Sequence, residues 1–154
     1  MPLVPGSPAD LVRQRLLDAM RVETFFPPAD PADVAAAEAR LGVPFPAWLR
    51  ELYLACDGFV GPTGWHYLSR LGGRDGLVEF TEFLRLEAWA PPWLARVIVF
   101  ASDTSSGTLT THFAALDGDL IEWCLGDGDE YTKFDGTVYD LYRREQSRWD
   151  ELQV

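Results

Sequence analysis

The chain has few basic residues for its length, and this scarcity already limits its partners. Its 154 residues include 13 Lys and Arg against 24 Asp and Glu, giving a formal net charge of −11. Nucleic acids and anionic membrane surfaces attract basic proteins and repel acidic ones. The composition therefore argues against binding to nucleic acid or to a membrane surface, and it favours association with a basic protein.

Cysteine is also scarce, and the hydrophobic runs are short. The two cysteines, Cys56 and Cys124, are too few for a disulfide framework, and both lie in apolar sequence typical of buried free thiols. The longest strongly apolar run, residues 97–101, is far shorter than the roughly 20 residues that a membrane span needs. The first six residues lack the pattern of a secretory signal. We therefore expect a cytoplasmic protein.

Metal-binding and cofactor-binding motifs are missing as well. Zinc ligands usually occur in closely spaced pairs, and the candidates Cys56, His66, His112 and Cys124 form none. The acidic turn at residues 127–130 does not follow the spacing of a calcium-binding loop. Neither a P-loop nor a GxGxxG motif occurs. We expect no metal and no cofactor.

One weak catalytic pattern lies between residues 103 and 112. Asp103, Ser105, Ser106 and His112 supply the residue types of a serine hydrolase, but the serines do not lie in a GxSxG turn. The stretch is more typical of a polar loop between two strands. A hydrolase that uses Ser105 and His112 therefore ranks third among the three hypotheses for the function.

Capping signals and apolar spacing predict three helices in the first half of the chain. After a flexible tail at residues 1–6, Ser7 and Asp30 each precede a proline and can cap a helix. Gly42 is a suitable end for the second helix. Residues 48–56 have the apolar stripe of a third helix.

The second half of the chain reads mainly as short strands broken by glycine. The predicted strands are residues 65–71, residues 97–100 as a central strand, a hairpin of residues 108–116 and 120–125, and residues 131–134. Residues 77–80 form either a strand or the start of a helix that continues to residue 88. Thr137 and Asp140 form a capping box that starts a final helix.

This order of elements predicts an α+β fold. Helices precede a run of consecutive strands, and one helix follows them, which is typical of an antiparallel sheet flanked by N-terminal helices and a C-terminal helix. We expect residues 7–154 to form a single domain, because the length fits one hydrophobic core.

Acidic residues are concentrated near the predicted hairpin. Residues 117–140 contain eight acidic residues and one basic residue, so most of the excess negative charge lies there. This segment is either a solvated face or a docking surface for a basic protein. The candidate partner-binding acids are Asp117, Asp119, Asp127, Asp129 and Glu130.

Tryptophan is abundant, with six in the chain. Trp65, Trp89 and Trp93 lie in loop-like sequence beside proline or glycine. Such rings either cover the sheet or provide contact area for a partner at a low entropic cost. These three tryptophans join the candidate partner-binding residues.

Residues 33–58 also carry a recognisable pattern. A glutamate within a helix is followed by Leu-Gly, by a proline, and by an apolar helix that ends in Asp-Gly. The matching positions are Glu38, Leu41, Gly42, Pro46, Leu49, Leu52 and Gly58. This pattern resembles the opening motif of the SUKH superfamily of cell-wall assembly regulators and toxin-immunity proteins. Residues 97–103, 112–123 and 137–152 resemble its central strand, hairpin and closing helix, so the resemblance covers about residues 30–145.

The resemblance implies a non-enzymatic α+β domain whose motif residues are structural. Many bacterial members are similar to immunity proteins that bind and neutralise toxins, often nucleases. An acidic inhibitor suits a basic nuclease because it can imitate the phosphate charge of the nucleic acid. The alternative implied by the resemblance is a regulatory scaffold linked to cell-wall synthesis.

Overall fold

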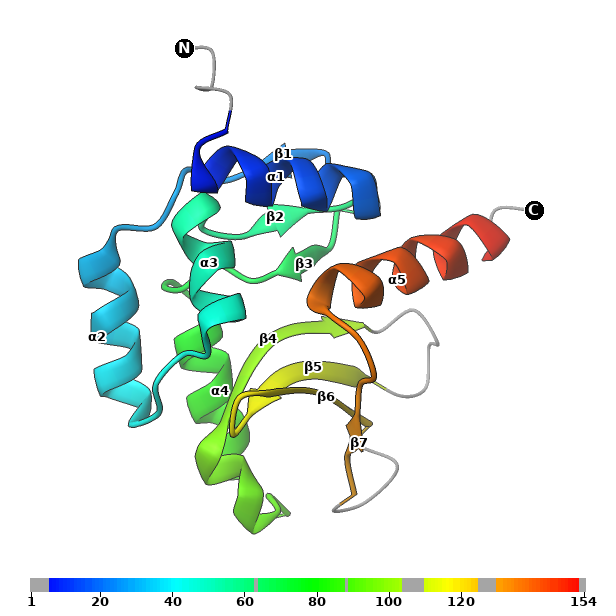
Figure 1. Ribbon diagram of the computed structural model, residues 1–154. Coiled ribbons are helices and arrows are strands. Elements are labelled where there is room, and N and C mark those ends of the chain that lie inside the picture. The colour runs from blue at the N-terminus through cyan, green and yellow to red at the C-terminus, as the bar shows by residue number, and fades with distance from the viewer. Residues whose placement is uncertain (1–5, 63, 88, 104–109, 125–129, 153–154) are drawn as a thin grey trace.

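The computed structural model describes residues 6–62, 64–87, 89–103, 110–124 and 130–152. Figure 1 shows helices packed above and beside two small sheets. The elements, in chain order, are α1 (Pro8–Ala19), β1 (Thr24–Phe25), α2 (Pro31–Leu41), α3 (Ala47–Ala55), β2 (Phe59–Val60), β3 (His66–Leu68), α4 (Leu77–Leu86), the 3-10 helix η1 (Pro92–Arg96), β4 (Val97–Asp103), β5 (Thr111–Leu116), β6 (Asp119–Cys124), β7 (Thr132–Lys133) and α5 (Val138–Leu152).

The predicted helix starts are confirmed by their caps. The Ser7 hydroxyl accepts a hydrogen bond from the Asp10 amide at 3.1 Å, and the Asp30 carboxylate accepts one from the Ala32 amide at 3.0 Å. At the start of α5, the Thr137 amide donates to the Asp140 carboxylate at 2.9 Å, and the Asp140 amide donates to the Thr137 hydroxyl at 3.3 Å. Local capping chemistry therefore sets where these helices begin.

The fold class is also confirmed, with the strands divided between two antiparallel sheets. One sheet has the order β1-β2-β3 and the other has the order β4-β5-β6-β7. The Ser69 amide donates to the Phe100 carbonyl at 2.8 Å, which ties the end of β3 to β4. Strand β1, which the sequence pattern did not indicate, is only two residues long.

The predicted hairpin is present as β5 and β6, but its turn is shorter than the three residues, 117–119, that separated the predicted strands. Leu116 pairs with Asp119, so Asp117 and Gly118 form a two-residue loop. Both loop residues have positive φ, 51° for Asp117 and 90° for Gly118. Positive φ at both positions defines a type I′ turn, whose twist matches that of the strands.

The structure decides the predictions for residues 77–88 and 97–100. Residues 77–86 form helix α4, so the helical alternative is confirmed there. The prediction that residues 97–100 form a central strand is wrong, because β4 is at one end of the four-stranded order. Its apolar sequence is explained by its contacts with α4 and β3, in addition to its pairing with β5.

The side chains of the four-stranded sheet alternate between two cores. Ile98, Phe113 and Leu120 face the main core with the helices α1, α3 and α5. Val99, Ala114 and Ile121 face a second, smaller core under α4 and η1. Because both faces are covered, residues 97–101 of β4, 113–116 of β5 and 120–121 of β6 are apolar without interruption. Among the described residues, no helix combines the length and apolar character of a membrane span.

Candidate interaction surface

A group of aromatic rings lies on the side of the four-stranded sheet that faces the smaller core. Trp123 on β6 is the buried member at the base of this group, with only 2% of its surface exposed. The ring centroids of Trp89 and Trp93 lie 5.8 and 5.2 Å from that of Trp123. Tyr131 lies 4.9 Å from Trp93 at a steep angle. These separations are those of favourable edge and tilted aromatic pairs.

The run of rings continues across the sheet to α4. His112 is the cross-strand neighbour of Trp123, and their centroids are 5.2 Å apart. Phe80 on α4 lies 5.6 Å from His112, and Phe83, one helical turn later, lies 6.3 Å from Phe80. We call this continuous set the aromatic surface, and its members are Phe80, Phe83, Trp89, Trp93, His112, Trp123 and Tyr131.

The aromatic surface opens to solvent at three points. The exposed fractions are 57% for Phe83, 46% for Trp89 and 44% for Tyr131. Monomeric proteins rarely leave connected large rings in water unless they bind something. Acidic side chains lie beside the two ends: Asp75 and Glu79, together with the basic Arg74, line a groove of about 360 Å³ with Phe83, and exposed Glu130 precedes Tyr131.

His112 is held within this surface as a neutral packing residue. Its side chain is 2% exposed, and Nδ1 lies 2.7 Å from the Ser102 hydroxyl. Burial lowers the pKa of His112 to about 4 because water no longer solvates the imidazolium. Within the described ranges, Nε2 is buried without a hydrogen-bond partner. Ser105 and Ser106, the serines of the hydrolase hypothesis, lie outside the described residues.

The structure separates the predicted partner-binding acids. Asp117 and Asp119 lie at the turn of the hairpin, while Trp123 lies near its opposite end. Asp117 forms an ion pair with Arg96 at 3.2 Å, and Asp119 forms one with Lys133 at 3.4 Å. Of the others, only Glu130 falls next to the aromatic surface. Asp127 and Asp129 lie outside the described residues.

The predicted tryptophans are separated as well. Trp89 and Trp93 both contact Trp123, but Trp65 packs against the main core. Trp65 also borders a small cavity that Glu145 and Trp149 line. Trp93 is half-buried and covers the sheet, while Trp89 also packs against Trp123 but is 46% exposed.

Sequence reasoning missed the other rings of the aromatic surface, although signals for them exist. Alternation along β6 puts Trp123 on the same face as Ile121, and Phe80 and Phe83 have i, i+3 spacing on one helix. Neither signal shows that helix and strand bring these rings together. That juxtaposition depends on how α4 packs on β4.

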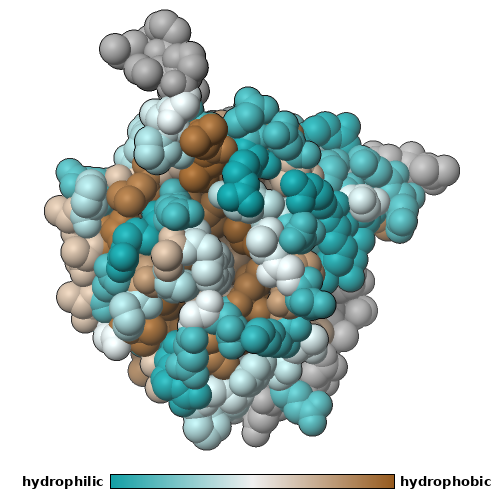
Figure 2. All heavy atoms as spheres, in the orientation of Figure 1, coloured by the Kyte–Doolittle hydropathy of each residue, from teal (hydrophilic) through white to brown (hydrophobic). Residues whose placement is uncertain are grey.

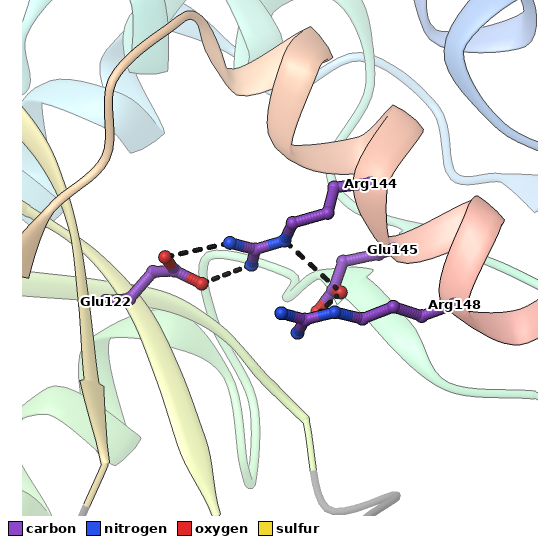
Figure 3. A network of polar contacts seen from close by, with 4 residues as sticks. All are labelled: Glu122, Arg144, Glu145 and Arg148. Atoms are coloured by element: carbon purple, nitrogen blue, oxygen red, sulfur yellow. Dashed lines mark hydrogen bonds and ion pairs between the residues drawn. The ribbon is translucent and has the colours of Figure 1, made fainter.

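Acidic residues of the 117–140 segment are partly neutralised by arginines from other elements. Arg144 on α5 donates both Nη atoms to the carboxylate of Glu122 on β6, and Glu145 pairs with Arg148 at 3.4 Å (Figure 3). Burial raises the pKa of Glu145 to about 7, with the negative charge of Asp103 adding to the effect and Arg144 opposing it. This network fastens α5 to the sheet.

Each of the seven motif residues contributes to a turn, to a helix end or to the main core. One Glu38 carboxylate oxygen accepts from the Phe45 amide at 2.8 Å and from Arg50 at 3.0 Å, which closes the turn between α2 and α3. Pro46 precedes the first residue of α3. The remaining five are three leucines buried in the main core and two glycines with positive φ: Leu41, Leu49, Leu52, Gly42 and Gly58.

No metal centre is present among the residues that the structure describes, since no group of three or more His, Cys, Asp or Glu side chains is placed to hold an ion. Cys56 is buried, which raises the pKa of its thiol to about 12, and Cys124 is half-buried.

A comparison with protein-family models matches residues 28–144 to the SMI1 / KNR4 family (SUKH-1). A comparison with curated proteins finds no match.

Proposed function

Because the chain belongs to the SMI1 / KNR4 family (SUKH-1), we propose that it is a non-enzymatic binding domain that neutralises a basic bacterial toxin. The single observation that supports this proposal best is the aromatic surface. Its three exposed rings, Phe83, Trp89 and Tyr131, belong to one connected set supported from below by buried Trp123.

Rigid aromatic side chains are well suited to anchor a protein partner. They provide a large contact area and lose little rotamer entropy on binding, which is why Trp and Tyr dominate interface hot spots. Trp89 is already fixed against Trp123, and Tyr131 is fixed against Trp93. The surface therefore needs little reorganisation before it contacts a partner, so less of the binding free energy is lost to ordering.

The acidic residues define the kind of partner. Asp75, Glu79 and Glu130 lie at the ends of the aromatic surface, and the whole chain has a net charge of −11. Lys and Arg of a partner would contact these carboxylates, and Arg would also stack on the exposed rings. A toxin that acts on nucleic acid has such a basic surface. Long-range attraction would speed their association at low salt.

The test is a capture experiment on lysate of the source organism, with this protein as bait and captured chains identified by mass spectrometry. Three baits are compared: wild type, the double variant Trp89→Ala with Tyr131→Ala, and the control Leu17→Ala. Leu17 is similarly exposed, at 49%, but lies on α1 away from the aromatic surface.

The proposal predicts that wild type and Leu17→Ala capture a chain with a basic domain, and that the double variant does not. Production of that domain alone should stop growth of a bacterial host, and co-production of the wild-type protein should restore growth. Capture of wall-synthesis or regulatory proteins by all three baits would instead favour the scaffold alternative. A captured basic domain that is harmless would contradict neutralisation.

A further inference from the structure

A second apolar region lies away from the aromatic surface, between helices α1 and α3. These helices are side by side at one end of the molecule, and apolar residues reach the surface there between hydrophilic ones (Figure 2). The groove between them has a volume of about 420 Å³. Its apolar lining consists of Pro8, Ala9, Leu11, Val12 and Leu54.

Two features of this groove need an explanation. Leu11 is 55% exposed and Leu54 is 36% exposed, and these two leucines from neighbouring helices line the same groove, whereas the exposed Leu17 of α1 lies outside it. Burying an exposed leucine contributes about 2 kcal/mol, so leaving two beside an apolar groove is unfavourable for an isolated molecule. A partner that covers the groove would remove this cost.

The charges at the border of the groove are balanced, in contrast to the rest of the chain. Arg15 and Glu51 line it, one from each helix, and both are exposed. Arg15 is held with its guanidinium carbon 3.9 Å from the centroid of the Tyr139 ring. Nearby Asp10 and Arg13 neutralise each other at 3.1 Å. The border thus presents one fixed cation and one anion.

We propose that this groove is the interface of a symmetric homodimer. Leu11 of each copy enters the groove of the other, and Arg15 of each copy meets Glu51 of the second copy. In a two-fold interface each contact between two different residues occurs twice, so a border with one charge of each sign complements itself. This inference is independent of the proposed function, because the groove shares no residue with the aromatic surface.

A second copy fits this border better than a basic protein does. A basic partner gains most where carboxylates outnumber bases, as they do in the chain as a whole, and it would be repelled by Arg15. Two acidic copies repel each other over most of their surfaces, and they can approach best where the local charges cancel. The groove between α1 and α3 is such a place.

The first test is sedimentation equilibrium of the purified full chain over a wide range of micromolar concentrations. Wild type should form dimers as the concentration rises, and Leu11→Arg should stay monomeric. Leu17→Arg is the matched control, because it adds the same charge on the same helix outside the groove, and it should dimerise like wild type. A wild type that is monomeric throughout, or a Leu11→Arg variant that still dimerises, would overturn the proposal.

The second test exchanges the two border charges. Arg15→Glu and Glu51→Arg should each raise the dissociation constant of the dimer by roughly tenfold, because each creates two like-charge contacts. The double variant should return it to within about threefold of wild type, since opposite charges face each other again. If Arg15 served only to pack on Tyr139, the double variant would have a dissociation constant no lower than that of Arg15→Glu. That result would overturn the proposed contact.

Discussion

Arg144 on α5 donates two hydrogen bonds to the carboxylate of Glu122 on β6, so the last helix is joined to the sheet by a two-point contact. The guanidinium also lies 5.2 Å from the centroid of Phe134. Both charged side chains are less than one-third exposed. The contact is therefore shielded from water more than an ordinary surface ion pair.

We predict that Glu122→Gln lowers the free energy of unfolding by about 1–3 kcal/mol, because Arg144 loses a charge-assisted pair in a partly buried setting. Chemical unfolding followed by circular dichroism measures the change. The control is Arg21→Ala, which breaks the exposed pair with Asp150 on the same helix and should cost less than about 1 kcal/mol. Equal losses for the two variants would contradict the special role of Glu122.

Two buried titratable groups should oppose each other in the pH dependence of stability. The pKa of Glu145 is raised from 4.5 to about 7, so the folded state binds a proton that the unfolded state releases. Its contribution makes the protein less stable as pH rises from 4.5 to about 7. The pKa of His112 is lowered from 6.5 to about 4, and its contribution makes the protein less stable as pH falls from 6.5 to about 4.

The variants Glu145→Gln and His112→Phe should separate these contributions. Without Glu145, unfolding free energy should rise between pH 4.5 and 6.5, and without His112 it should fall over the same interval. Each group accounts for at most about 3 kcal/mol. Arg144, Arg148, Asp103 and Glu122 face Glu145 and are unchanged in both variants. Urea unfolding at several pH values is the measurement, and slopes equal to wild type in both variants would refute this account.

Gly58 should be far less tolerant of substitution than Gly42, although both have positive φ. A Cβ atom on Gly58 would lie 2.7 Å from the Leu68 carbonyl oxygen, whereas nothing lies within 4 Å of one on Gly42. We expect Gly42→Ala to cost about 1 kcal/mol for the backbone conformation alone, and Gly58→Ala to cost several times more. Thermal unfolding of the two variants measures their losses of stability. Equal losses would contradict the prediction, because they would mean that β3 moves away from the added Cβ atom.

Features that depend on neighbouring residues could be predicted from the sequence. Ser7, Asp30 and Thr137 cap helices through bonds that reach two or three residues along the chain. The Asp117-Gly118 turn likewise follows from the freedom of these residues to adopt positive φ. Such local preferences need no knowledge of the rest of the fold.

Features that depend on packing could not be predicted in the same way. The continuous apolar run at residues 97–101 indicates that both faces of β4 are buried, but it does not show that β4 lies at one end of the four-stranded order. The charge of residues 117–140 appeared concentrated because Arg96 and Arg144, which pair with Asp117 and Glu122, lie outside that segment. The aromatic surface likewise combines rings from α4, η1, β5 and β6 with Trp89 and Tyr131, which lie in connecting segments.

The most direct measurement of the central claim is calorimetric titration of a captured basic domain with this protein at low and at high salt. We predict tight binding by wild type that weakens as salt rises, and at least about tenfold weaker binding by the variant with Trp89→Ala and Tyr131→Ala. Wild type should also abolish the toxicity of that domain. Equal binding by wild type and variant, with no dependence on salt, would contradict the claim that the aromatic surface recognises a basic toxin.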